Sequence, residues 1–225
     1  MPYVWNDEQS EAFLRVAGAS KSVQLVRDEG ILDFVYFVPN ENQCSACHVT
    51  EHPDGQMHPL GATARELSSS FDHAGDDPVL QTELMRKRSW LDQLPTRMEA
   101  VSWQTYSADI QDPALVEELD LAYLNIHCGH CHNPQGAADT SGLLLDGSHS
   151  LAVNLGVCKP PGAAGGGAGD LQFSIVPAAP EKSILIYRMN SLAPDEMMPE
   201  LGRSLVHHEG LELIRHWIAT MPGGC

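Results

Sequence analysis

Residues 44–48 read CSACH and residues 128–132 read CGHCH, so the chain carries the pattern C-x-x-C-H twice. This pattern is typical of the attachment site of a c-type haem. Its two thiols can form thioethers with the two vinyl groups of one haem, and the histidine that follows then binds the iron as its proximal ligand. The sequence therefore predicts two covalently attached haem c groups. The residues that would hold them are Cys44, Cys47, His48, Cys128, Cys131 and His132.

Two other uses of paired cysteines compete with haem attachment. Four cysteines could bind one structural zinc ion, but these two pairs are far apart for a zinc ribbon, and zinc does not require a histidine after each pair. A thioredoxin-like redox pair is expected near a βαβ pattern, and neither motif has one around it. The pattern therefore favours haem. We expect His130, inside the second motif, to be a surface group or a neighbour of the haem ligands.

The length of 225 residues allows one or two domains, and a hydrophobic content of 43% is enough for a core. The chain contains no run of 18 apolar residues, so we expect no transmembrane helix. Its first residues also lack the basic start and apolar stretch of a signal peptide. Because covalent haem attachment normally follows export, we expect an export signal upstream and a periplasmic or extracellular protein.

The chain is acidic, with 30 Asp and Glu residues against 13 Lys and Arg residues and a net charge of −17. Such a surface repels phosphates, so the sequence argues against nucleic acid as a partner. It could steer a basic redox partner toward the protein, although many of these carboxylates would serve solubility alone. Four cysteines are assigned to haem, and the remaining two, Cys158 and Cys225, are predicted to form a disulfide rather than to stay as free thiols.

The N-terminal half shows short and varied patterns. We expect helices at 6–17, 62–70 and 78–94, from the spacing of their apolar residues. Residues 23–26 and 31–38 are rich in β-branched and aromatic residues on either side of a glycine, which predicts a β-hairpin. The first C-x-x-C-H motif follows this hairpin through a short polar loop, with no helix leading into it.

Around the second motif the sequence predicts helices. Pro113 marks a helix start, and an apolar stripe, Leu115, Leu119, Ala122, Tyr123 and Ile126, leads into the motif. The C-terminal helix is predicted from the spacing of Leu211, Ile214, Trp217 and Ile218, with Ser204 as its cap. Between them, residues 162–169 are rich in glycine and alanine and are expected to form a flexible loop, not a phosphate-binding loop.

These patterns predict a mainly α fold, with cytochrome c-like helical modules around two covalent haems and a short N-terminal β-hairpin region. We divide the chain into an N-terminal segment (1–40), a first haem module (41–108) and a second, class I cytochrome c-like module with the glycine-rich insert (109–225).

The sixth iron ligand decides whether a haem carries electrons or binds ligands. For the second haem we expect Met198, which stands before a proline in the loop that precedes the C-terminal helix, with Met197 as the neighbouring alternative. Pro134 could offer its carbonyl oxygen to the ring N–H of His132. For the first haem, Met57 and His58 are the favoured candidates, and an open sixth position also remains. Weaker alternatives are His52, His73, Met85 and Met98.

Several stretches carry a resemblance that spans almost the whole chain: residues 36–48, 59–67, 128–134, 141–143, 156–161, 175–177, and 198–204 with Trp217. In these stretches the chain resembles a family of exported bacterial di-haem c-type cytochromes of unassigned physiological role. The resemblance implies an exported electron-transfer protein with a β-rich region before its haem sites, and it supplies neither donor nor acceptor. Members of that family look longer at the N-terminus, and residues 57–58 do not match a signature of the family.

The leading functional hypothesis is therefore a di-haem cytochrome that passes single electrons between exported redox proteins. An enzyme, such as a di-haem peroxidase or the cytochrome subunit of a dehydrogenase, would need an open first haem with acid or base groups above it. A third hypothesis is a repeating subunit of a filament or larger complex, in which the N-terminal strands pair between copies.

Overall fold

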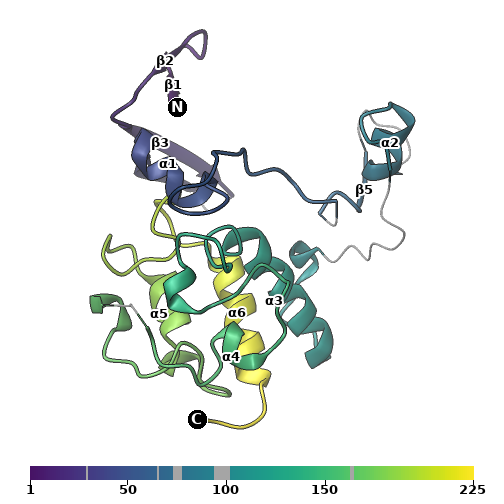
Figure 1. Cartoon of the computed structure of the whole chain (residues 1–225), viewed down its shortest axis with the longest axis vertical. Helices are drawn as coiled ribbons and strands as arrows, with labels where there is room; N and C mark the ends of the chain where they lie inside the picture. Colours follow the sequence, from purple (N-terminus) through teal and green to yellow (C-terminus); the bar gives the residue numbers. More distant parts are fainter. Residues whose placement is uncertain (29, 65, 73–77, 94–101, 163–164) are drawn as a thin grey trace.

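The computed structural model describes residues 1–28, 30–64, 66–72, 78–93, 102–162 and 165–225. Helices α3 (Pro113–His127), α5 (Ile184–Asn190) and α6 (His208–Thr220) stand side by side and form the core, with the N-terminal strands and α1 (Glu41–His48) above them (Figure 1). Both predicted helices of the C-terminal half are therefore present.

Each of the two main helices has a local reason to form. Asp112 caps α3, because its carboxylate accepts a hydrogen bond from the Ala114 N–H at 3.0 Å, and Pro113 occupies the first position. All four residues of the stripe predicted for α6 are buried in the core. That helix begins at His208, three residues after the position predicted for its start, and Ser204 is not its cap.

The buried face of α3 is rotated from the one that the sequence predicts. Leu119 and Tyr123 are buried as expected, but Leu115 and Ile126 are exposed. Val116 and Leu124 are buried instead, as is the carboxylate of Asp120.

A glycine sets how closely α3 and α6 approach. A Cβ atom built on Gly210 would overlap the ring of Tyr123, so a side chain at this position would push the two helices apart. The aromatic ring of α3 thus packs against bare backbone at the first turn of α6.

The first strands replace a predicted helix. Strand β1 (Tyr3–Trp5) pairs antiparallel with β2 (Ala12–Leu14), so the helix expected over residues 6–17 is wrong. The reason lies in Asn6, whose side-chain oxygen accepts hydrogen bonds from the backbone N–H groups of Ser10 and Glu11. These bonds favour a turn over a helix.

The predicted β-hairpin is confirmed and is longer than expected. Strand β3 (Ala19–Arg27) pairs antiparallel with β4 (Gly30–Val38) over nine residues each. Helix α1 follows directly, with a capping box in which the Asn40 side chain accepts from the Gln43 N–H and the Gln43 side chain accepts from the Asn40 N–H. The first C-x-x-C-H motif therefore lies on a helix, not after a loop.

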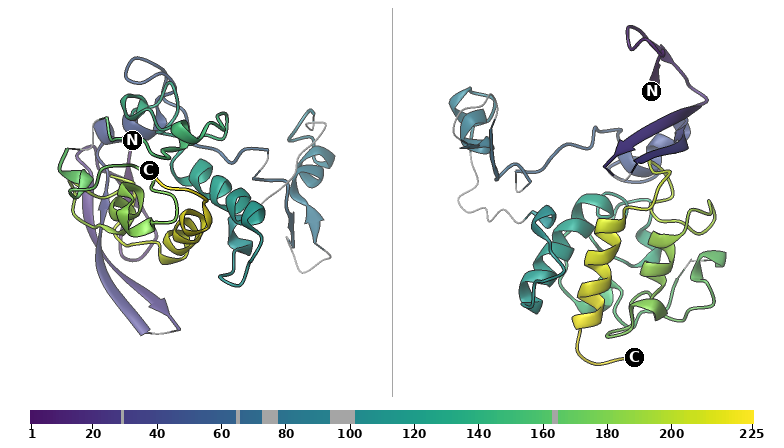
Figure 2. Two further views of the ribbon diagram at one scale, coloured as in Figure 1. Left: turned by 90° about the horizontal axis from the view of Figure 1, so that it is seen from below. Right: turned by 180° about the vertical axis from the view of Figure 1, so that it is seen from behind.

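The segment that follows α1 is mostly irregular. It contains β5 (Ser70–Phe71), β6 (Val79–Leu80) and α2 (Gln81–Lys87), which lie apart from the helical core in every view (Figure 2). The helix expected over 62–70 is absent from the described part of that range, and the helix expected over 78–94 is limited to α2. Residues 65 and 94 lie outside the described residues.

Short elements complete the C-terminal half: η1 (Trp103–Thr105), η2 (Asp139–Ser141), α4 (Ala152–Leu155), η3 (Gly165–Ala168) and η4 (Pro180–Lys182). Two residues of the glycine-rich stretch, 163 and 164, lie outside the described residues, and η3 follows them. Cys158 and Cys225 are bonded as a disulfide, as predicted, and tie this half to the C-terminus.

The prediction of a mainly α fold built of cytochrome c-like modules is wrong. The described residues are 32% helical and 16% strand and form six α-helices and three two-stranded antiparallel sheets, so the fold is mixed α/β. Strands β2, β5 and β6 account for part of the difference, because they lie where helices were expected over residues 6–17, 62–70 and 78–94. Within the described residues, none of the helices combines the length and apolar character needed to cross a lipid bilayer.

Contacts also cross the boundary drawn at residue 108. Trp103 and Tyr106 were assigned to the first module, yet both pack against the core formed by α3, α5 and α6. The Tyr106 hydroxyl also lies 3.1 Å from Nδ1 of His216 on α6.

Candidate functional site

The second C-x-x-C-H motif forms one turn at the end of α3. Cys128 is the C-cap residue of that helix, and the N–H groups of Cys131 and His132 donate to its carbonyl oxygen at 3.1 and 2.9 Å. This turn brings both cysteines and the histidine to one side of the chain. Burial raises the pKa of the Cys128 thiol to about 12.

The glycine of this motif has a packing role. A Cβ atom on Gly129 would lie 2.7 Å from the carbonyl oxygen of Asn125 and 2.8 Å from the Cα atom of Asp146. Because real Cβ atoms do not approach other atoms so closely, the position needs glycine. The turn of the motif therefore packs closely against the backbone of Leu145 and Asp146.

A cavity of about 300 Å³ opens beside this turn. That volume lies at the lower end of the range found for small-molecule and cofactor pockets. The predicted second-haem residues line it together: Cys128, Cys131, His132 and Met198. Residues that lie far apart in the sequence therefore line one cavity. Two residues of the first motif, Cys44 and His48, do not line it.

A hydrogen bond at Nδ1 orients the His132 ring and leaves Nε2 free. Ser141 donates its hydroxyl hydrogen to the Ala138 carbonyl at 2.6 Å, so its oxygen can only accept from Nδ1 of His132, 3.2 Å away. Nδ1 therefore carries the proton and Nε2 keeps a lone pair for a metal. The predicted partner, the Pro134 carbonyl, is replaced by this hydroxyl. Burial, with Arg188 nearby, lowers the pKa of His132 to about 4, so the ring is neutral at pH 7.

Two methionines reach the cavity. Met198 lines it from the loop before α6, where its N–H donates to the Arg188 carbonyl at 3.0 Å. Met197, the alternative, is not among the lining residues. Met189 of α5 lines the cavity too and is 9% exposed, a residue that the sequence analysis did not single out. Met189 belongs to the hydrophobic core, whereas Met198 lies in the loop before α6.

Two arginines give the cavity a cationic wall. Arg188 and Arg203 both line it, and desolvation lowers the pKa of each guanidinium. Their hydrogen bonds go mainly to backbone oxygens: Arg188 Nε to Glu196, and Arg203 Nη2 to Ser191. Glu200 is the nearest counter-charge described for Arg188, at 3.8 Å. Such a wall suits an anionic group, for example a carboxylate.

The first C-x-x-C-H motif occupies the second half of α1. Spacings of three and four residues place Cys44, Cys47 and His48 on one face of this helix. Nδ1 of His48 lies 2.8 Å from the carbonyl oxygen of His58. Since a carbonyl only accepts, Nδ1 carries the proton and Nε2 is again free to bind a metal. Both motif histidines thus have the tautomer that a proximal ligand needs.

The favoured sixth ligands of the first haem lie beside its motif. Met57 forms a β-bridge with Val49, and the His58 N–H donates to the His48 carbonyl at 2.8 Å. Both residues are exposed, and neither lines the cavity beside the second motif. Their assignment as ligands stays a prediction.

Two of the four weaker alternatives lie within the described residues. His52 is exposed and its backbone N–H donates to the Gln135 carbonyl. Met85 lies on α2, away from the helical core (Figure 2). The other two, His73 and Met98, lie outside the described residues.

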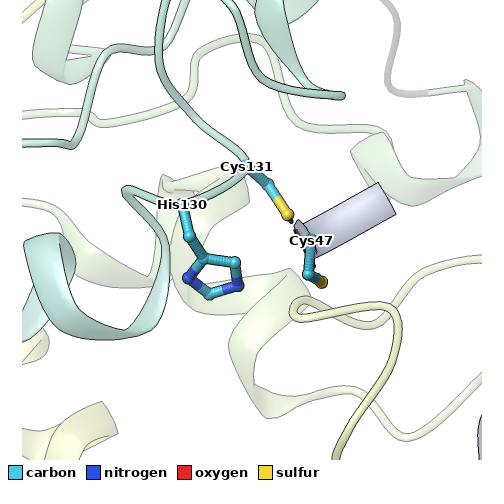
Figure 3. Close-up of side chains that lie close together, drawn as sticks. All are labelled: Cys47, His130 and Cys131. Atoms are coloured by element: carbon cyan, nitrogen blue, oxygen red, sulfur yellow. Dashed lines mark hydrogen bonds between the residues drawn. The ribbon is translucent and has the colours of Figure 1, made fainter. Parts of the chain in front are cut away.

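The two motifs meet at a cluster of three side chains (Figure 3). Cys47, His130 and Cys131 place their ligand atoms within 4.8 Å of one another. Cys131 Sγ lies 3.7 Å from Cys47 Sγ and 3.2 Å from the Ala46 carbonyl oxygen. Hydrogen bonding by Cys131, and then by His130, lowers the pKa of the Cys47 thiol, while the same contact raises that of Cys131.

This cluster bears on the zinc hypothesis. Cys44 and Cys128 are described residues and do not belong to the group, so the four motif cysteines do not form one tetrahedral site. Two positions were expected for His130, on the surface or beside the predicted haem ligands. It is half-buried and lies beside Cys47, and a hydrogen bond with Cys47 raises the pKa of His130, so the second position describes it.

An aromatic and histidine cluster forms another part of the cavity wall. The Tyr123 hydroxyl lies 3.0 Å from Nδ1 of His207, and the Tyr123 ring lies 4.3 Å from the His127 ring, centroid to centroid. Nε2 of His127 is buried without a hydrogen-bond partner among the described residues, and burial lowers its pKa. The spacing of Tyr123 and His127 on one helix face is the signal that could have indicated this pair.

No protein-family model, curated protein or solved structure matches this chain.

Proposed function

We propose that this chain is an exported di-haem c-type cytochrome that carries single electrons between redox proteins. The observation that supports this most is the convergence of Cys128, Cys131, His132 and Met198 on one cavity. Two thiols, an imidazole with a free Nε2 and a thioether are the donor set of a haem c with histidine and methionine ligands. The residues present therefore fit the group.

The chain's own residues would act on that group in distinct ways. Cys128 and Cys131 would attach the second haem, and Ser141 fixes the orientation of the His132 ring. Arg188 and Arg203 would neutralise haem carboxylates in the cavity. A bound haem would supply iron(III)/iron(II) cycling, and the protein would set its potential by ligand choice, burial and charge.

The first haem would be held by Cys44, Cys47 and His48. Their common face on α1 and the His48–His58 hydrogen bond support this assignment. No residue is assigned as its sixth ligand. Ligand binding or peroxidase-like chemistry at this haem is therefore an outcome that the experiment below distinguishes.

Export and partner are part of the same proposal. The Cys158–Cys225 disulfide is compatible with the periplasm or the cell exterior, where disulfides persist. A net charge of −17 would attract redox partners with a basic docking face and repel acidic ones.

The Cys47, His130 and Cys131 cluster favours a second candidate function, the binding of a soft metal ion such as Zn²⁺ or Cu⁺. It requires free thiols, so it excludes haem attachment at these two cysteines. The two candidates therefore predict different masses for the purified protein.

The test is the mass and optical spectrum of the protein purified from an exporting, haem-attaching host. We expect a mass increase of two haems and a c-type spectrum, oxidised and reduced. Replacing Cys128 and Cys131 by Ser should remove one haem, whereas the control with Cys158 and Cys225 replaced by Ser should keep both. A chain without covalent haem would overturn the proposal. Carbon monoxide binding to one haem would indicate an open sixth position at the first haem, and peroxide turnover would then be the next measurement.

A further inference from the structure

The two predicted attachment sites touch each other. Cys47 and Cys131 belong to motifs 84 residues apart, yet their sulfur atoms are 3.7 Å from one another. Cys131 Sγ also lies 3.2 Å from the Ala46 carbonyl, so it contacts both the backbone and a side chain of the first motif. Figure 3 shows the Cys131 side chain pointing from the second motif toward Cys47.

The contact between the two motifs has a second support. Beyond the first motif, the His52 N–H donates to the Gln135 carbonyl at 2.9 Å, so the loops that follow the two motifs are also joined. Ala46 and Cys47 also line the cavity that Cys128, Cys131 and His132 line. The first motif is thus part of the wall of the second site.

We propose that Cys47 and Cys131 form the junction between the two haem groups, so that electrons cross directly from one site to the other. This inference rests on the proposed function, because both sulfurs would be haem thioethers. With both haems bound, one electron would pass between the iron that His48 would hold and the iron that His132 would hold. This transfer would make and break no bond, move no proton, and need only the external donor and acceptor.

Two physical consequences follow from this contact. Electron tunnelling weakens exponentially with distance, and two sulfurs in van der Waals contact leave little protein to cross. Charge at one site also acts on the other through a poorly polarisable medium. Reduction of the first iron should therefore make reduction of the second less favourable and separate the two midpoint potentials by tens of millivolts, where about 59 mV corresponds to a tenfold change.

The experiment compares the full chain with two double variants that each keep one haem. In the first, Cys44 and Cys47 are both replaced by Ser. In the second, Cys128 and Cys131 are both replaced by Ser. We expect a two-signed Soret circular dichroism band in the full chain that the summed spectra of the variants lack. The midpoint potential of each remaining haem should also shift by tens of millivolts. The junction would be overturned if the Soret circular dichroism of the full chain equalled the sum of the two variant spectra and the midpoint potentials were the same in the variants and the full chain.

A measurement on the unaltered protein covers the case in which a variant fails to fold. Paramagnetic resonance of the half-reduced and fully oxidised protein should show that the signal of one haem changes with the oxidation state of the other. Independent signals would overturn the junction while two haems by mass still support the proposed function. A chain without haem would overturn the proposed function itself.

Discussion

The His132 ring hydrogen-bonds the hydroxyl of Ser141, nine residues further along the chain, at 3.2 Å. The hydroxyl in turn donates to Ala138 and accepts from the N–H of Leu143. One side chain therefore joins the turn at the end of α3 to the loop that closes behind it. The ring orientation is set by this loop and not by the motif alone.

If the second haem is attached as proposed, replacing Ser141 by Ala should raise its reduction potential by an amount on the order of tens of millivolts. The hydroxyl accepts from Nδ1, which would make His132 a more basic ligand and favour iron(III). Without the acceptor, iron(III) is less stabilised. Potentiometric titration measures the shift. Ser148→Ala, at an exposed serine bonded to Asp146, is the matched control and should leave the potential unchanged. A lowered or unaltered potential in Ser141→Ala would contradict this role.

If Met198 is the sixth ligand of the second haem, as proposed, replacing it by Leu should convert that haem to a high-spin form that binds carbon monoxide. Leucine keeps most of the volume but offers no sulfur, so the iron would lose its sixth ligand. Optical spectra with and without carbon monoxide measure the change. Met189→Leu and Met197→Leu are the controls, with a stability loss below about 1.5 kcal/mol for such volume-conserving changes. If Met189→Leu alone opened the iron, the ligand would be on α5.

The parts of the fold that the sequence predicted correctly have strong local signals. Asp112 before a proline indicates the start of α3, and the alternation of β-branched and aromatic residues indicates the β3–β4 hairpin. The failures occur where a side chain overrides such a signal. Asn6 bonds two backbone N–H groups and forms a turn inside a helix-like pattern. On α3, apolar residues lie on more than one face, so Leu115 and Val116 are equivalent in sequence but not in burial.

The candidate site divides in the same way. The two C-x-x-C-H motifs and Met198 can be identified from spacing and from the neighbouring proline. Ser141 and Met189 cannot, because their roles depend on a loop and a helix that reach the cavity only in three dimensions. The contact between Cys47 and Cys131 is likewise a property of the packing of two distant segments.

Replacing Gly210 by Ala should lower the free energy of unfolding by roughly 1–3 kcal/mol. The added Cβ would overlap the Tyr123 ring and force α6 away from α3. Urea denaturation followed by circular dichroism measures the loss. Gly224→Ala is the control, since no atom lies within 4 Å of its added Cβ. Equal stability of the two variants would show that the helices separate without cost.

Removing the disulfide, with both Cys158 and Cys225 replaced by Ser, should cost about 4 kcal/mol of stability, from the loop-closure entropy of an unfolded chain cross-linked across 67 residues. Urea denaturation at a fixed pH measures the difference. A reductant added to the unaltered protein should reproduce the loss, because it opens the disulfide but leaves haem thioethers intact. Equal unfolding midpoints for the oxidised protein and the variant would contradict the expectation.

The buried carboxyl of Asp120 should make the protein less stable as pH rises. This side chain is 0% exposed, and neither oxygen has a hydrogen-bond partner among the described residues. Desolvation, and then the charge of Glu117, raises its pKa well above the usual range. The folded chain therefore keeps a proton that the unfolded chain loses at an ordinary pKa of about 3.9. Stability from this group is complete below that pH and falls as pH rises toward the folded pKa.

Replacing Asp120 by Asn should remove this dependence. Within that window the Asp120 carboxyl should contribute a fall in unfolding free energy of about 1.4 kcal/mol per pH unit. Unfolding free energies measured in urea at successive pH values should therefore fall more steeply, by about this amount, in the unaltered protein than in the variant. Asp109→Asn, at an exposed position, is the matched control and should keep the slope of the unaltered protein. If Asp120→Asn and Asp109→Asn gave the same slope, the Asp120 carboxyl would be ionised in the fold, and a partner such as bound water would have to satisfy its oxygens.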